Sequence, residues 1–425
     1  MDIAQIKKID WQRIEENFKI SLYPVMVPGW TDIIDGSRKT IGIKQNYILS
    51  AHFGHNAAFY GSHKEWDRIG RFILKRILNN PGWGKKVNQE IIFRSRQLVN
   101  FSHQLATIDL SRRSTIDLIK YYQRYEQLHG RLYHYAIIPV FLDLYQPLLS
   151  DYLMAYLNKQ KLSVFNASEV FGILTTPNKP SQIHQEELAL MMLAKKIKAN
   201  FKARQLFKKN LVKIKKDYLK LGPLAKAIKN HHQQYSYQGY NWEGPPFSLD
   251  YFLKRLKELV NNQNLETEIR EKKNYHSKIK LKQKQYLAAI KLDKKHQILF
   301  SLTGDFIYTK DLRKDYLVRS YFDLSYLLAE LALRLNLSFL QVRNLTLAEL
   351  KDLAKGKKII AEQNNRLKAA VYVVCQGKTP GKIFVNDQAW QIINYLKGKE
   401  KVTRRAETSG QVAYPGNARG KVLIV

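Results

Sequence analysis

Apolar residues recur at helical spacing over most of the chain, and this periodicity constrains the fold more than any other feature of the sequence. From Glu65 the pattern continues for about two hundred residues, with breaks at turn residues such as Asn80-Pro81-Gly82. A second helical block covers 285–354, where the apolar residues of 316–337 form one stripe. The spacing predicts helices over 65–79, 84–106, 114–136, 138–158, 166–173, 181–220, 222–233 and 248–261.

Helix starts are marked by hydroxyl residues followed by carboxylates. Ser114 precedes Asp117 by three residues and Thr346 precedes Glu349 by three, which is the spacing of a capping box. Ser248 with Asp250 indicates a similar start. Residues 263–285 are charged and poor in apolar side chains, so we expect an exposed helix or a linker there.

Both ends of the chain depart from this pattern. We expect a helix over 1–20, which carries mixed charges and no signal peptide, and short extended pieces over 21–45, which is rich in Pro and Gly. Near the other end a β-branched run, a turn and a second run predict a strand–turn–strand. The ranges are 366–385 for this hairpin, 387–396 for a short helix, 398–407 for a charged linker and 410–425 for two further strands.

The fold class expected is therefore mainly α, with a multi-helix middle domain and a small C-terminal β portion. We expect five segments: an N-terminal helix and loop-rich segment (1–64), a helical domain (65–262), a charged linker or exposed helix (263–284), a helical block ending in a β-hairpin (285–400), and the first strands of a further domain (408–425).

The chain is strongly basic, with 71 Lys and Arg against 36 Asp and Glu and a net charge of +35. The densest stretch, 195–229, holds thirteen Lys or Arg and one acid, Asp217. A basic helical module that binds nucleic acid is one interpretation. We favour a general lysine enrichment of the surface, because Lys greatly outnumbers Arg and no nucleic-acid-binding motif occurs.

Several classes of protein are excluded by composition. The single cysteine, Cys375, excludes a disulfide framework and fits a packing role within a strand. No run of about 18 uncharged apolar residues occurs, so we expect no membrane span and no membrane partner. These features suggest a cytoplasmic protein.

Histidines and carboxylates suggest no definite catalytic or metal site. His52, His55 and His63 lie in a loop-rich stretch, but neither Glu nor Cys stands at ligand spacing beside them. His184 with Glu186 and Glu187 could be an acid–base group or the first turn of a helix. No glycine-rich nucleotide loop is present. We therefore assign no catalytic and no metal-ligating residue.

One aromatic stretch is a candidate binding surface. Tyr235, Tyr237, Tyr240 and Trp242 follow the pair His231-His232 closely. They could line a pocket for a planar substrate, or they could pack a turn that leads to the next helix.

Four motifs, in order, resemble phosphoenolpyruvate-utilising enzymes of the phosphoenolpyruvate synthase and rifampicin phosphotransferase type. The His-rich aromatic step at 231–252 comes first. The second is a helical stretch that opens with a Lys-Asp-x-Arg-Lys run at 310–314 and leads to Leu-Thr-x-x-Glu-Leu at 345–350, and the third is the small hairpin at 366–390. The end of the chain resembles the opening strands of the family's swivelling phosphohistidine domain. Its matching positions are Gly410, Ala413, Gly416, Gly420 and Val422.

The resemblance implies a fragment or truncated member of such a phosphotransferase. In the complete architecture a grasp domain binds ATP and Mg²⁺, and a mobile histidine carries the phosphoryl group to an acceptor. This chain has neither the grasp domain nor the phosphohistidine motif, so a separate or missing partner would supply both. A non-catalytic scaffold or regulatory homologue is a further alternative.

The same resemblance suggests an acceptor site. We expect the wall of this site to be formed by Tyr235, Tyr237, Tyr240 and Trp242. Phosphate would be attracted by Lys310, Arg313 and Arg319, although for these three cations we favour an ordinary helix surface.

Overall fold

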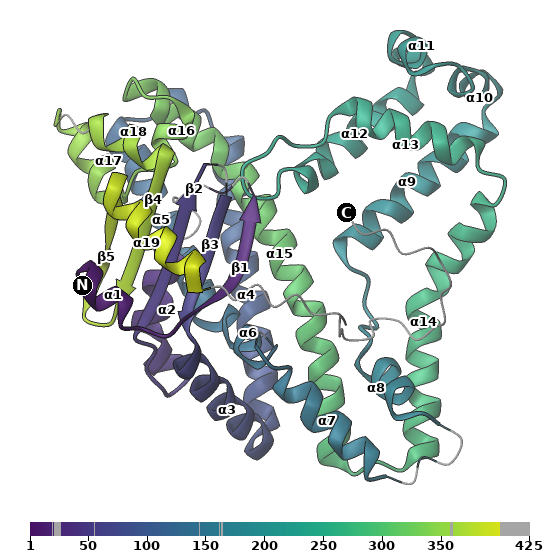
Figure 1. Ribbon diagram of the computed structural model, residues 1–425. Helices are drawn as coiled ribbons and strands as arrows, with labels where there is room; N and C mark the ends of the chain where they lie inside the picture. Colours follow the sequence, from purple (N-terminus) through teal and green to yellow (C-terminus); the bar gives the residue numbers. More distant parts are fainter. Residues whose placement is uncertain are drawn as a thin grey trace.

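The computed structural model describes residues 1–18, 20, 27–54, 56–143, 145–160, 162, 165–357 and 360–399. The described chain is mainly α-helical and has one small antiparallel sheet, as the sequence predicts. The sheet lies on one side of the long helix α15 (Lys294–Arg334), and a separate group of helices lies on the other (Figure 1).

The sheet joins the two ends of the described chain. Its order is β1-β3-β2-β4-β5, and every neighbouring pair is antiparallel. The predicted hairpin supplies β4 and β5, and the three other strands come from the N-terminal segment. In the central pair, Ala51 of β2 stands opposite Val371 of β4. The strands are β1 (Trp11–Phe18), β2 (Tyr47–Phe53), β3 (Asn56–Ser62), β4 (Ala369–Cys375) and β5 (Lys378–Val385).

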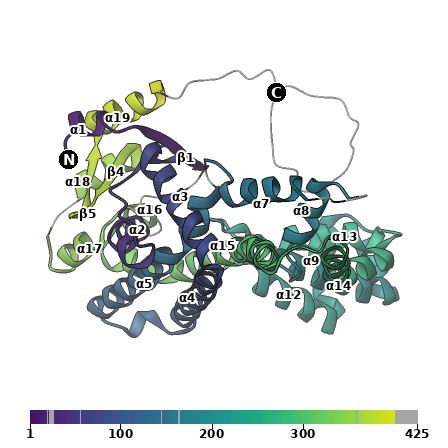
Figure 2. The same cartoon turned by 90° about the horizontal axis from the view of Figure 1, so that it is seen from below.

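Helices cover both faces of this sheet, so its central strands are buried on both sides (Figure 2). Phe59 and Tyr372 belong to the main core together with residues of α2 (Val27–Thr40) and α5 (Thr115–Ala136). On the opposite face, Tyr60 and Val371 pack in a core with α1 (Ile3–Lys7) and α19 (Asn386–Lys399).

Two predictions for the N-terminal segment are wrong. The helix expected over 1–20 ends at Lys7, and 11–18 form β1 because β3 offers them a distant partner. The extended pieces expected over 21–45 are replaced, within the described residues, by α2. Gly36 is not a turn residue there: a Cβ on it would lie 2.5 Å from the His134 ring, so it allows α2 and α5 to approach closely.

The helical body is built along α15. Helix α4 packs beside α15 over much of its length, and Gly84 of α4 accommodates Leu302 of α15. The other helical elements of this body lie between residues 63 and 175 of the chain. They are α3 (His63–Asn79), α4 (Pro81–Thr107), η1 (Leu110–Arg112), α6 (Ile138–Asp143), α7 (Leu148–Asn158) and α8 (Ala167–Thr175).

A second group of helices, here called the α9–α13 lobe (182–261), has its own hydrophobic core. The single helix predicted over 181–220 is wrong: it is broken at Asn200 and Asn210, whose side chains each cap a new helix. The elements are α9 (Gln182–Ala199), α10 (Phe201–Phe207), α11 (Leu211–Asp217), η2 (Tyr218–Leu221), α12 (Pro223–Tyr235), η3 (Ser236–Gly239) and α13 (Leu249–Asn261).

Helix α14 (Leu265–Ile290) connects the lobe to α15, so the exposed-helix alternative for 263–284 holds. Beyond α15, the predicted capping box of Thr346 and Glu349 is present at the start of α17, and Glu349 also pairs with the buried Arg366 at 2.5 Å. The strands predicted over 410–425, with the motif positions Gly410 to Val422, lie outside the described residues. The last short helices are α16 (Phe339–Val342), α17 (Leu347–Ala354) and α18 (Ile360–Lys368).

Candidate functional site

The predicted aromatic stretch packs against α15 and forms no open wall. Tyr235, Tyr237 and Tyr240 are each at most 7% exposed. Tyr235 contacts the ring of His231 inside the α9–α13 lobe, whereas Trp242 packs on Tyr321 of α15. The alternative of a packed turn therefore describes this stretch best, and its binding role stays a prediction.

Tyr237 and Arg319, two of the residues expected in the acceptor site, do come together. The Tyr237 hydroxyl donates to both carboxylate oxygens of Asp315, at 2.9 and 3.0 Å. The Arg319 guanidinium lies 4.9 Å above the Tyr237 ring and donates to Asp323 at 3.0 Å. Burial raises the pKa of Asp315 to about 6, although Tyr237 and Arg319 act in the opposite direction.

Tyr240 and Trp242 are held by an arginine that the sequence did not single out. Arg343 donates to the Tyr240 hydroxyl at 3.3 Å and to the Trp242 carbonyl at 2.6 Å. It is 2% exposed and also lies against the Phe339 ring. These contacts fasten the aromatic stretch to the segment after α15.

Lys310 and Arg313 are already engaged within the protein. Lys310 pairs with Asp143. Arg313 donates to the carbonyl of Ala136, at the end of α5, at 2.7 Å. Binding of phosphate by Lys310 would have to replace an existing ion pair, so the phosphate role of these cations stays a prediction.

His52 and His231, two of the histidines considered in the sequence, contact other groups of the protein. His52 is buried beside the carbonyl of Ile20, and burial lowers its pKa to about 4. His231 contacts Glu186, which also accepts from Arg255. His55 lies outside the described residues. His129, which the sequence did not indicate, contacts the Tyr321 hydroxyl at 3.0 Å in the core.

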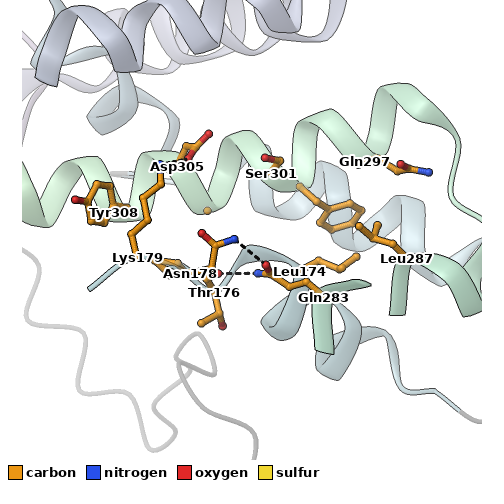
Figure 3. A pocket seen from close by; sticks show the side chains of 13 residues that line it. Leu174, Thr176, Asn178, Lys179, Gln283, Leu287, Gln297, Ser301, Asp305 and Tyr308 are labelled. Carbon is orange, nitrogen blue, oxygen red and sulfur yellow. Dashed lines mark hydrogen bonds and ion pairs between the residues drawn. The ribbon is translucent and has the colours of Figure 1, made fainter. Parts of the chain in front are cut away.

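A cavity of about 150 Å³ lies between α8, α14 and α15 (Figure 3). Its apolar part is formed by Leu174, Leu287 and Phe300. Gly304 allows α15 to approach the end of α8, because a Cβ there would lie 3.0 Å from the Thr175 carbonyl oxygen. The rest of the lining is mostly polar, including Asn178, Gln297 and Ser301, so water can enter this cavity.

The other end of the cavity carries opposite charges. Lys179 Nζ lies 3.8 Å from the Asp305 carboxylate and 5.4 Å from the centre of the Tyr308 ring. Both charged side chains are about half exposed, and Figure 3 shows them pointing toward each other on the side away from Leu287. The charged pair therefore stands in contact with solvent, at the entrance.

Gln283 of α14 fixes the segment that follows α8. Its amide nitrogen donates to the carbonyls of Ile173 and Thr176, at 3.0 and 2.8 Å. Its carbonyl accepts from Asn178 at 3.1 Å. This arrangement holds Lys179 near α15 and keeps the cavity formed.

The chemistry of this cavity suits a small molecule with a ring-sized apolar part and a polar end. Sequence reasoning missed it, because its lining comes from three separated segments and contains no recognisable motif. The segment 176–179 gives only a weak signal: a Pro-Asn turn after a helix.

Among the described residues, no group of three or more His, Cys, Asp or Glu side chains lies close enough to hold a metal ion. The same residues contain no helix that is long and apolar enough to cross a membrane. No family model, curated protein or solved structure matches this chain.

Proposed function

We propose that this chain is the helical part of a phosphoenolpyruvate-utilising phosphotransferase, which supports a mobile phosphohistidine domain and binds the phosphoryl acceptor. The cavity between α8, α14 and α15 carries the proposal. It lies on the same helix, α15, that bears the Lys-Asp-x-Arg-Lys motif at 310–314. The acceptor site proposed here is this cavity, and not the aromatic stretch expected from the sequence.

The order of elements supports the assignment. After α15 the chain forms the capped helix α17, the hairpin of β4 and β5, and α19, which ends at Lys399. The segment 408–425, which resembles the start of the mobile domain, follows directly. A carrier domain attached after α19 would follow the sheet in the chain, and this sheet packs on the helical body.

The entrance of the cavity offers groups that suit phosphoryl transfer. In such a transfer the N–P bond of phosphohistidine breaks, an O–P bond to the acceptor forms, and the acceptor hydroxyl loses its proton. In this proposal the Asp305 carboxylate, 3.8 Å from Lys179 Nζ, would receive this proton, and Lys179 would offset the charge of the phosphoryl group. The ring of the acceptor would occupy the apolar end.

ATP and Mg²⁺ belong to the grasp domain in this proposal. The chain alone should therefore acquire no acid-labile phosphate from labelled ATP or phosphoenolpyruvate. A labelled chain would contradict the proposed division between helical part and carrier. We place the activity in the cytoplasm, where both donors occur.

A ligand screen tests the acceptor site directly. We expect small cyclic alcohols to bind in ligand-observed NMR, and Ser301→Leu, which adds bulk to the lining of the cavity, to abolish binding. Ser277→Leu, on the exposed side of α14, is the matched control and should bind normally. Asp305→Asn should retain binding. If no alcohol binds, or if Ser301→Leu binds as well as the control, the acceptor role is wrong and a scaffold role takes its place.

A further inference from the structure

The end of the α9–α13 lobe combines positive charge with exposed apolar side chains. We call residues 201–221, which form α10, α11 and η2, the basic cap. These three elements pack against one another, and α10 and α11 lie at the end of the lobe that points away from the sheet (Figure 1). The basic cap contains eight Lys or Arg and one carboxylate, Asp217.

Internal ion pairs balance only part of this charge. Asp217 pairs with Lys213 at 3.0 Å and with Lys220 at 2.6 Å, and Lys215 pairs with Asp250 at 2.6 Å. Four exposed lysines form no ion pair with any described residue, so their charge is available to an external anionic partner. They are Lys202, Lys208, Lys209 and Lys216.

Three large apolar side chains of the basic cap are also exposed. Phe201 is 66% exposed, Val212 76% and Leu219 54%. The helical pattern of the sequence places Phe201 on a buried stripe, but the break at Asn200 turns it toward solvent. Exposed apolar groups within a cationic surface are a feature of protein surfaces that bind other molecules.

The chemistry of the exposed groups favours lipid over nucleic acid. A nucleic-acid surface commonly adds aromatic stacking and arginine contacts to its charge, and the basic cap exposes one large aromatic residue and has one arginine, Arg204. Val212 and Leu219 are aliphatic and cannot stack on a base. Aliphatic and Phe side chains next to lysines suit the boundary between phosphate headgroups and acyl chains.

We propose that the basic cap docks on an anionic lipid surface. Its lysines bind headgroup phosphates, while Phe201, Val212 and Leu219 enter the interface. A peripheral contact of this kind needs no spanning helix, so it departs from the sequence-based expectation of no membrane partner, which rested on the absence of a span. The inference is independent of the proposed phosphotransferase function.

Vesicle flotation of the full chain tests the proposal. At about 0.1 M salt we expect at least tenfold stronger partitioning to phosphatidylcholine vesicles with about 30% phosphatidylglycerol than to phosphatidylcholine alone. Lys208→Glu/Lys209→Glu/Lys216→Glu should lower this partitioning roughly 100-fold. Val212→Ser/Leu219→Ser leaves the charge unchanged and should lower it several-fold.

Helix α14 provides matched controls. Lys278→Glu/Lys280→Glu/Lys282→Glu makes the same change of charge at exposed positions, and Leu281→Ser removes a 57% exposed leucine. Both should change partitioning less than twofold. If the α14 variants lower vesicle partitioning as much as the basic-cap variants do, the whole charge of the protein attracts it to the vesicles, and the proposal is overturned.

A fluorescent oligonucleotide separates the two anionic partners. Tight binding of a 20-nucleotide RNA with no partitioning to anionic vesicles would overturn the lipid assignment and favour the nucleic-acid interpretation. Partitioning that survives Val212→Ser/Leu219→Ser unchanged would also contradict the proposal, because lipid insertion requires those side chains.

Discussion

The sheet and the α9–α13 lobe reach a buried core by different routes. The sheet pairs β2 with β4, which are separated by most of the chain, whereas the lobe is folded from the continuous segment 182–261. Pairing of distant strands carries a larger loop-closure entropy than local helix packing. We therefore expect the lobe to form first and the sheet to depend on the rest of the body.

The two regions also differ in the pKa of a buried glutamate, which is raised beside the sheet and lowered in the lobe. Glu65, beside the sheet, accepts from the backbone amides of Asn46 and Tyr47, and burial raises its pKa despite these bonds. Glu186, in the lobe, also loses hydration, but its hydrogen bonds with His231 and Arg255 outweigh burial and its pKa is lowered. The cation nearest Glu65, Arg68, lies 3.9 Å away and is 55% exposed, so it does not offset burial, whereas Arg255 bonds Glu186 directly at 2.9 Å.

The largest predicted effect is on the sheet. Phe59 of β3 is 1% exposed in the main core, and Phe59→Ala should lower the free energy of unfolding by about 4 kcal/mol. Hydrogen exchange should accelerate across β1 to β5, with little change in α9–α13. Equal acceleration in both regions would show one cooperative unit and remove the distinction.

Breaking the buried ion pair of the lobe should have a slightly smaller effect. Glu186→Gln leaves Arg255 without its carboxylate and should cost about 3 kcal/mol. Faster exchange should be confined to α9, α12 and α13. The matched control, Glu187→Gln, alters a partly exposed pair and should cost less than about 1 kcal/mol. If Glu186→Gln instead lowered hydrogen-exchange protection mainly in the sheet, the lobe and the sheet would not have separate cores.

The two glutamates predict opposite dependences on pH. The raised pKa of Glu65 favours folding below its unfolded value of 4.5, and this contribution is lost as pH rises through the folded pKa. The lowered pKa of Glu186 favours folding above 4.5, and that contribution is lost as pH falls through the folded pKa.

Region-resolved hydrogen exchange measured between about pH 3 and pH 7 checks this difference, after correction for the intrinsic exchange rate. As pH falls, the α9–α13 lobe should lose stability relative to the sheet. Glu65→Gln and Glu186→Gln should each flatten the profile of their own region. Parallel profiles in the unsubstituted protein would contradict the electrostatic contrast.

The smallest effect concerns the exposed residues of the lobe. Val212→Ser/Leu219→Ser should change the unfolding free energy by less than about 0.5 kcal/mol, because both side chains already face solvent. Urea denaturation followed by circular dichroism measures it. A loss above about 2 kcal/mol would mean that these side chains help to stabilise the fold.

Local signals in the sequence predicted several helices correctly but missed the breaks at Asn200 and Asn210, and contacts between distant segments were missed. The range 114–136 agrees with α5 because Ser114 caps its start, and the hairpin 366–385 agrees with β4 and β5 because a turn joins its strands. Strand β1 was missed because its partner β3 lies beyond α2. Nothing local shows that Gly36 serves helix packing instead of a turn.

The candidate site was less predictable than the fold. Tyr237 and Arg319 meet as a shared site would require, but the helical spacing could not show that Asp315 and Asp323 occupy their polar groups. The cavity depends on α8, α14 and α15 packing together, and on Gln283 holding the segment after α8. Such an arrangement is visible only in three dimensions.

The coding sequence beyond the codon for Val425 tests the central claim most directly. The phosphotransferase account predicts that the reading frame continues into the rest of a swivelling domain with a Gly-Gly-x-x-Ser/Cys-His segment, whose histidine carries the phosphoryl group. A stop codon at that point, or a continuation without this segment, would contradict the account.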